Sequence, residues 1–176
     1  FWHADAQPPL HEVTLEDWDR HMELNLRCHF IVCRNVIPHL LAQPESVIVN
    51  IGTTGARRGE DGYAAYAAAK AGLESLTRSI AAQYGRAGLR CSCLVPGLVL
   101  DGAVDAAMAA IPAAKAAFDR IDRQALLPRG HGDGKCVADA AAFLVSDAAR
   151  WVTGESLVLD GGAISHSAPW ADGRGL

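Results

Sequence analysis

The chain has 176 residues, of which 50% are hydrophobic and 20% charged, and its formal net charge is -4. This composition is typical of one globular domain with a sizeable core, so we treat residues 1–176 as a single domain. The acidic balance provides no broad positive field, so we expect neither nucleic acid nor an anionic membrane surface as a partner.

The cysteines and histidines show no pattern of a metal site or a disulfide framework. The five cysteines are odd in number and contain no CxxC pair: Cys28, Cys33, Cys91, Cys93 and Cys136. We expect buried free thiols in a reducing compartment, which favours a cytoplasmic location. The histidines form neither an HxxxH nor an HExxH pattern, so no metal is expected. No apolar run reaches the roughly 18 residues of a membrane-spanning helix.

The first regular pattern in the chain begins at Thr14. Thr14 with Asp17 three residues later is typical of a helix N-cap. Asn25 is a polar side chain on the stripe of apolar residues that follows. The stripe has helical spacing and predicts one long amphipathic helix; its members are Leu15, Trp18, Met22, Leu26, Phe30, Cys33, Ile37 and Leu40 or Leu41.

Two short apolar runs then predict strands. Ser46–Ile51 (SVIVNI) is rich in β-branched residues and nearly all apolar, so we expect a strand that is buried on both faces of a parallel sheet. The alanine-rich residues 63–84 predict a helix that Gly85 ends. A second strand is predicted over 89–95 and is stopped by Pro96 and Gly97.

The remaining third of the chain is less regular at first. We interpret residues 98–134, with their prolines and the run PRGHGDG, as a substrate-facing lid of loops and short helices. A helix is predicted over 137–146 and a strand over 156–160, whereas 163–176 forms an irregular tail. The alternation of strands and helices predicts a doubly wound α/β domain with a parallel sheet.

The segment TGARRGED, residues 54–61, allows two interpretations. A phosphate-binding loop would need a glycine where Asp61 stands, and it would need an acidic residue at the end of the next strand, which reads CLVPG. The carboxylate of Asp61 would also repel a pyrophosphate. The sequence therefore favours the second interpretation, in which this segment ends a strand whose hydroxyls face Tyr66 and Lys70.

Tyr66 and Lys70 are four residues apart and share one face of the predicted helix. An isolated pair of this kind is more often a packing aromatic beside a solvated lysine. An ammonium group close to a phenol, however, favours the phenolate and makes the pair a candidate acid/base couple. Thr53 and Thr54 support this chemistry, because they end a strand at the rim where open α/β sheets place their sites.

Four segments, taken in order, resemble the short-chain dehydrogenase/reductase superfamily. They are MELNL, VIVNIGTTG running to YAAYAAAKAGL, LRCSCLVPGLV, and the stretch from PRGHGDG to LDGG. The resemblance covers nearly the whole chain. It implies a Rossmann-like fold, NAD or NADP as cofactor, and a homodimer or homotetramer assembled through two long helices.

The resemblance also implies roles for the paired side chains. Tyr66 would be the catalytic acid/base, and Lys70 would hold the nicotinamide ribose and lower the pKa of Tyr66, so both side chains are expected to contact the cofactor. Thr53 lies 13 positions before Tyr66, where the family usually has serine, and would hydrogen-bond the substrate oxygen. Thr54 is the alternative for that hydroxyl.

Further roles follow on the first helix and after the second strand. Asn25 would order a water in the proton path. The backbone after Pro96 and Gly97, near Val99, would contact the nicotinamide amide. A hydroxyl that the family often has a little further on is replaced here by Asp101.

Members of this superfamily begin with a strand, a TGxxxGxG loop and an NNAG segment, and none of these precedes Phe1. We therefore expect the chain to be the C-terminal part of a longer protein. The missing part would carry the pyrophosphate site and a strand that pairs with Ser46–Ile51. Without that strand we expect the chain to aggregate or to need a complementing chain.

The leading hypothesis is an oxidoreductase that transfers a hydride between nicotinamide and a small secondary alcohol or ketone. A non-catalytic chain that keeps the fold as an interaction or oligomerisation module is the alternative, motivated by Thr53 and the absent glycine loop. A related lyase or epimerase would use the same Tyr66 and Lys70 but would retain its cofactor through turnover.

Overall fold

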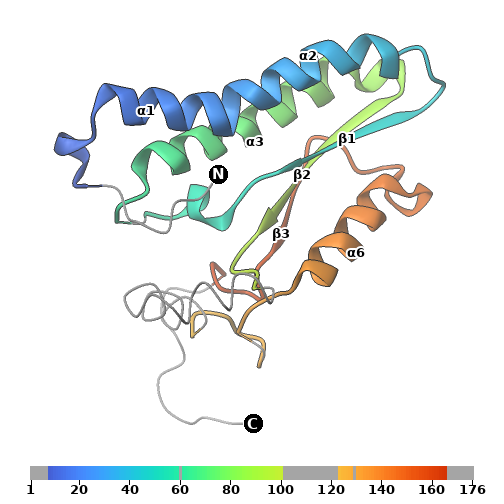
Figure 1. Cartoon of the computed structure of the whole chain (residues 1–176). Helices are drawn as coiled ribbons and strands as arrows, with labels where there is room; N and C mark the ends of the chain where they lie inside the picture. Colours follow the sequence, from blue (N-terminus) through green and yellow to red (C-terminus); the bar gives the residue numbers. More distant parts are fainter. Residues whose placement is uncertain (1–7, 60, 101–122, 129, 166–176) are drawn as a thin grey trace.

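The computed structural model describes residues 8–59, 61–100, 123–128 and 130–165. In this part of the chain three strands form one parallel sheet in the order β1-β2-β3 (Figure 1). The strands are β1 (Ser46–Ile51), β2 (Leu89–Pro96) and β3 (Ser156–Leu159). The α-helices are α1 (Leu15–Met22), α2 (Cys28–Leu40), α3 (Ala64–Tyr84) and α6 (Gly134–Val145). Shorter helical turns are η1 (Leu10–Glu12), η2 (Glu23–Arg27), η3 (Thr54–Arg57), η4 (Gly85–Ala87) and η5 (Asp147–Ala149).

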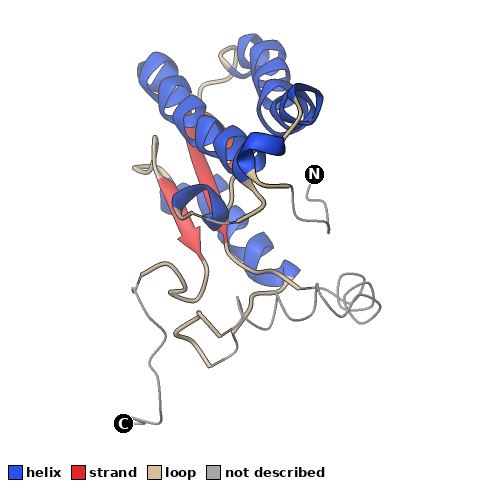
Figure 2. Ribbon diagram, turned by 90° about the vertical axis from the view of Figure 1, so that its left-hand side faces the viewer, coloured by secondary structure: helices blue, strands red, loops and turns tan. Residues whose placement is uncertain are grey.

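The helices cover the two faces of the sheet. α1, η2 and α2 form one long rod that runs beside α3 on one face, and α6 lies on the other face (Figures 1 and 2). The core under the rod consists of apolar and thiol side chains from α2, α3 and β2: Cys33, Ile37, Ile80, Ala81, Leu89 and Cys91. This arrangement confirms the predicted fold class, an incomplete, Rossmann-like doubly wound parallel sheet.

The first helix begins as predicted but is not one regular α-helix. The hydroxyl of Thr14 accepts a hydrogen bond of 3.1 Å from the backbone N–H of Asp17, which confirms the cap. In η2 the chain makes a π-helical turn, in which the N–H of Cys28 donates to the carbonyl of Glu23. Two members of the predicted apolar stripe, Leu15 and Phe30, are 82% and 48% exposed in the structure.

The prediction that Ser46–Ile51 is buried on both faces is also wrong. Within the described residues β1 pairs only with β2, so its other edge is open. Most of its side chains are half-buried, and Ile51 is 40% exposed. The bounds of the strand agree with the prediction, because they follow from its β-branched residues.

One helix boundary agrees with the sequence prediction and one differs. α3 ends at Tyr84 and Gly85 is its C-cap, as predicted; Gly85 keeps right-handed torsions and begins η4, and the left-handed residue is Gly88, with φ 88°. α6 begins at Gly134 rather than near residue 137, because the carboxylate of Asp133 caps it by accepting from the N–H of Cys136 at 2.8 Å. Much of the proposed lid, residues 101–122 and 129, lies outside the described residues.

Candidate active site

The carboxyl ends of the three parallel strands meet at one rim of the sheet, and the predicted site residues gather beside it. η2, which carries Asn25, and η3, which directly follows Thr53, both pack against α3. α3 carries Tyr66 and Lys70 near its N-terminal end. Gly72 lets η2 approach closely, because a Cβ at this position would lie 2.8 Å from a methyl group of Leu26.

Lys70 is a buried cation that contacts the end of β1. Only 8% of the residue is exposed, and its Nζ donates a hydrogen bond of 2.9 Å to the backbone oxygen of Ile51. Burial lowers the pKa of Lys70, and the nearby thiols of Cys93 and Cys28 partly oppose this shift. The ammonium group of Lys70 is thus largely desolvated and is held at Ile51, two residues before Thr53 in the sequence.

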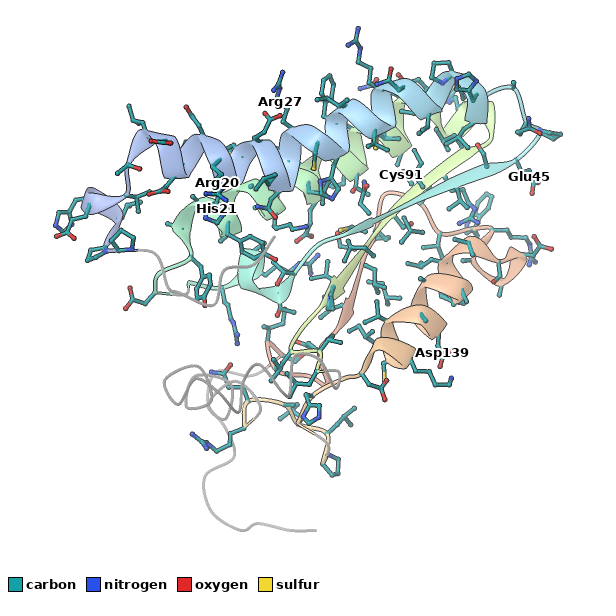
Figure 3. All side chains as sticks on the ribbon, viewed as in Figure 1. Arg20, His21, Arg27, Glu45, Cys91 and Asp139 are labelled. Carbon is teal, nitrogen blue, oxygen red and sulfur yellow. The ribbon has the colours of Figure 1, made fainter. Side chains whose placement is uncertain are left out.

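Tyr66 lies one helical turn before Lys70 and is half-buried. The ring of His21, on α1, meets the ring of Tyr66 edge to face, with 6.4 Å between ring centroids and 73° between ring planes. Figure 3 shows His21 on the side of α1 that points toward the start of α3. This contact could not be predicted from the sequence, because the two residues belong to different helices.

Asn25 is 1% exposed and lies inside the π-helical turn. Its side-chain amide donates a hydrogen bond of 3.1 Å to the carbonyl of His21, one turn earlier. A buried amide and an irregular turn at the same position are a recurrent combination at functional sites. The polar residue on an apolar stripe was the sequence signal that identified it.

The two candidate hydroxyls differ in their surroundings. Thr53 has an extended backbone at the end of β1, and its hydroxyl accepts a hydrogen bond of 3.3 Å from the N–H of Gly55. Thr54 is 4% exposed and begins η3. Thr53 is the less buried of the two, so its hydroxyl is the better placed to meet a substrate.

Pro96, Gly97 and Val99 lie at the end of the neighbouring strand. The N–H of Gly97 bonds to the carbonyl of Leu159 at 2.9 Å, and a Cβ on Gly97 would lie 2.7 Å from the Cβ of Asp160. Val99 forms a parallel bridge with Gly132. The backbone after β2 is thus held at the rim on both of its sides, by the end of β3 and by the segment before α6.

One ion pair beside the site was missed by sequence reasoning. Arg57, the last residue of η3, makes a two-pronged contact with Glu74 on α3. Glu74 lies four residues after Lys70 and eight after Tyr66, so the three share one helix face. This spacing could have identified Glu74 from the sequence. Nothing in the sequence indicated its partner Arg57, which lies 17 residues earlier.

The five cysteines are free, but only three of them are buried as predicted: Cys33, Cys91 and Cys93. Cys28 and Cys136 are half-buried, and the Sγ of Cys28 lies 3.2 Å from the Nδ1 of the neighbouring His29. Burial raises the pKa of Cys91 to about 12 and that of Cys93 to about 11. Both thiols therefore remain protonated at neutral pH, and Cys91 lies on the side of β2 that faces the helical rod (Figure 3).

The part of the chain that the structure describes lacks two kinds of feature. Its side chains include no cluster of three or more His, Cys, Asp or Glu residues that could hold a metal ion. Its helices include none that is both long and apolar enough to cross a membrane.

Known proteins resemble this chain over nearly its whole length. A family profile described as enoyl-(acyl carrier protein) reductase matches residues 2–164. A Bradyrhizobium diazoefficiens protein named "probable short-chain type dehydrogenase/reductase" is 37% identical over 162 residues, which are 92% of this chain and 56% of that protein. The 3beta-hydroxysteroid dehydrogenase 1 of Eggerthella lenta is 36% identical over 160 residues, which are 90% of this chain and 59% of that protein.

A solved structure shows the same fold. Gluconate 5-dehydrogenase from Burkholderia cenocepacia, in complex with NADP and tartrate, matches with a TM-score of 0.80 and 29% identity. The match covers 92% of this chain and 61% of that one, so the chain spans about three fifths of the length of these relatives. With the profile match across residues 2–164, these findings show that the chain belongs to the short-chain dehydrogenase/reductase superfamily.

Proposed function

We propose that the full-length protein is an NAD(P)-dependent oxidoreductase that transfers a hydride between nicotinamide and a secondary alcohol or ketone. The observation that carries this proposal is the buried ammonium of Lys70, one helical turn after Tyr66 and bonded to the neutral carbonyl of Ile51. Burying a cation against a neutral group is unfavourable, and such costly charges are common at functional sites. The names of the relatives, a hydroxysteroid dehydrogenase and a gluconate dehydrogenase, agree with this reaction class.

The chain's own residues would perform the proton chemistry. The phenol of Tyr66 would give a proton to the carbonyl oxygen during reduction and take one from the hydroxyl during oxidation. The positive charge of Lys70 would favour the phenolate, and the burial of Lys70 would strengthen that interaction. The Thr53 hydroxyl would hold the substrate oxygen, and Asn25 would support the path by which protons reach the site.

The residues at the rim fit a nicotinamide dinucleotide. When bound, this cofactor would supply or accept the hydride. Tyr66 and Lys70 would hold the ribose next to the nicotinamide, and the backbone from Pro96 and Gly97 to Val99 would hold the amide. These groups lie where parallel α/β sheets bind ligands, beyond the carboxyl ends of the strands.

The first experiment compares Tyr66→Phe with the unchanged full-length protein. Secondary alcohols, including hydroxysteroids and sugar acids, are tested with NAD and NADP, and formation of reduced nicotinamide is followed by absorbance. We expect Tyr66→Phe to lower kcat by about a thousandfold, because the phenol is the proton donor. Tyr84→Phe at the other end of α3 is the matched control and should keep its activity.

The outcomes separate the competing functions. Near-normal turnover of Tyr66→Phe would contradict the proposed mechanism. Substrate conversion without any net change in reduced nicotinamide would support a lyase or epimerase that retains its cofactor. Complete inactivity of the unchanged protein together with firm binding of another protein would support the non-catalytic module.

Finer features belong to the same proposal. The protein would act in the cytoplasm on a small-molecule substrate and would form a homodimer or homotetramer. Residues 98–134 would form the lid over that substrate. Residues 1–176 would belong to a single domain. Exposed apolar side chains on the rod support the assembly: Leu24, Phe30 and Ile31 are 42%, 48% and 39% exposed. Size-exclusion chromatography with light scattering tests the oligomeric state.

A further inference from the structure

The ion pair between Arg57 and Glu74 joins two elements that carry different parts of the proposed site. The Nη2 of Arg57 lies 2.5 Å from one carboxylate oxygen of Glu74, and its Nε lies 3.2 Å from both oxygens. The Glu74 side chain is 8% exposed and that of Arg57 33% exposed. A two-pronged contact of this kind fixes direction as well as distance.

The position of this pair relates it to the reacting groups. Arg57 is four residues after Thr53 and is the last residue of η3, which Thr53 precedes directly. Glu74 extends the helix face of Tyr66 and Lys70 by one turn. The pair therefore connects the segment that carries the Thr53 hydroxyl to the face that carries the phenol and the ammonium.

The charge state of Glu74 follows from its surroundings. Burial by itself would raise the pKa of Glu74, but the hydrogen bonds from Arg57 and the charge of Arg57 help to lower it. The carboxylate thus remains ionised and joins η3 to α3. Buried ion pairs contribute little net stability compared with apolar packing, so geometry is the better explanation for this one.

We propose that Arg57 and Glu74 are positioning residues, which hold the Thr53 hydroxyl in register with the Tyr66 phenol so that both meet the same substrate oxygen. The inference rests on the proposed hydride-transfer function. Neither residue touches the substrate in this proposal, because Arg57 acts through η3 and Glu74 acts through Arg57.

A double-mutant cycle in the full-length protein tests the proposal. Arg57→Met is made in the unchanged protein and in Thr53→Ala, and kcat, KM and the cofactor Kd are measured for all four proteins. In the unchanged background we expect Arg57→Met to lower kcat by about tenfold to a hundredfold, because a displacement of about 1 Å has that effect. In the Thr53→Ala background it should lower kcat by less than about twofold, because the hydroxyl that it positions is gone.

A general loss of structure gives a different result. It would lower kcat by the same factor in both backgrounds and weaken cofactor binding, and that outcome would overturn the proposal, as would an unchanged kcat. Arg27→Met breaks an exposed Arg–Glu pair on the outer side of the rod and is the matched control, expected to change nothing (Figure 3).

Further variants keep the test decisive. If circular dichroism shows that Arg57→Met does not fold, Arg57→Lys replaces it. Arg57→Lys keeps the charge but loses the two-pronged contact. Its effect on kcat must likewise depend on the presence of the Thr53 hydroxyl. Failure of the inference is distinguishable from failure of the proposed function. Activity that depends on Tyr66 but not on Arg57 rejects only the positioning role, whereas activity that depends on neither rejects the function.

Discussion

The Nζ of Lys70 donates a hydrogen bond of 2.9 Å to the backbone oxygen of Ile51, so the central helix is tied to the end of the edge strand through a buried cation. The acceptor is a neutral carbonyl, and burial lowers the pKa of Lys70. Desolvation of the Lys70 charge therefore lowers the stability of the folded chain, at the position where the proposed chemistry needs a positive charge.

Lys70→Met is expected to stabilise the chain while it abolishes activity. Methionine fills a similar volume without a buried charge, so the free energy of unfolding should rise by about 1 kcal/mol near neutral pH. A lysine whose pKa is lowered by folding destabilises the folded state most at a pH where it is charged in both the folded and the unfolded chain. The stability gained by Lys70→Met should therefore shrink as the pH rises through the folded pKa of Lys70. Urea unfolding of both proteins at about pH 7 and about pH 10 measures this difference.

Lys135→Met is the matched control for that experiment. Lys135 is 78% exposed and pairs with Asp139 on the surface of α6, so its loss should leave the free energy of unfolding nearly unchanged. A Lys70→Met protein that is less stable than the unchanged protein would show that the bond to Ile51 outweighs the desolvation.

Thr53→Ala and Thr54→Ala are expected to differ strongly in turnover. Thr53 lies two residues after the end of β1 and is only partly buried, whereas Thr54 is buried at the start of η3. Loss of one hydrogen-bond donor to the substrate oxygen lowers kcat by about a hundredfold, so we expect this loss for Thr53→Ala and less than about tenfold for Thr54→Ala. Thr53→Ser should retain activity, because the hydroxyl remains. The opposite order in steady-state kinetics would assign the role to Thr54.

The parts of the fold that depend on local chemistry could be predicted from the sequence. The Thr14–Asp17 cap and the bounds of Ser46–Ile51 follow from side chains close together in the chain. The π-helical turn around Asn25 could not be predicted, because η2 settles against Gly72 of α3, far away in sequence. For the same reason the Arg57–Glu74 pair emerges only when η3 and α3 are packed together.

Gly97→Ala is expected to disturb both the sheet and the proposed cofactor site. A Cβ at this position would lie 2.7 Å from the Cβ of Asp160, and backbone atoms rather than a flexible side-chain end must move to accommodate it. We expect a loss of about 2 kcal/mol in the free energy of unfolding and weaker binding of NAD or NADP in the full-length protein. Gly134→Ala, where a Cβ meets nothing within 4 Å, is the control for calorimetry and for the binding titration.

Glu74→Gln is expected to alter the acid dependence of stability. Folding lowers the pKa of Glu74 below its ordinary value of 4.5. The contribution of Glu74 to the free energy of unfolding is therefore complete above pH 4.5 and is lost as the pH falls through the pKa of the folded state. At neutral pH the variant leaves the partly exposed Arg57 without its anion, so its free energy of unfolding should be lower than that of the unchanged protein. This loss should narrow as the unchanged protein is acidified below 4.5, which urea unfolding at several pH values measures. A loss that stays constant across this range would contradict the assigned shift.

The open edge of β1 is expected to drive association of the 176-residue chain when it is expressed by itself. Beside this edge, α2 and β1 enclose an apolar groove of about 320 Å³, whose walls include Val32, Val36, Ile48 and Val49. An unpaired strand next to an apolar wall is a template for a strand of another molecule. We therefore expect oligomers or aggregates at micromolar concentration, measured by light scattering.

Ile51→Lys and Trp151→Lys separate the strand edge from general surface stickiness. Ile51 is 40% exposed at the end of β1, whereas Trp151 is 96% exposed and lies outside the strands. If strand pairing causes association, a charge at Ile51 should increase the monomer fraction severalfold and a charge at Trp151 should not, although Trp151 presents more apolar surface. The reverse result would assign association to exposed side chains and leave the edge of β1 without a role in it.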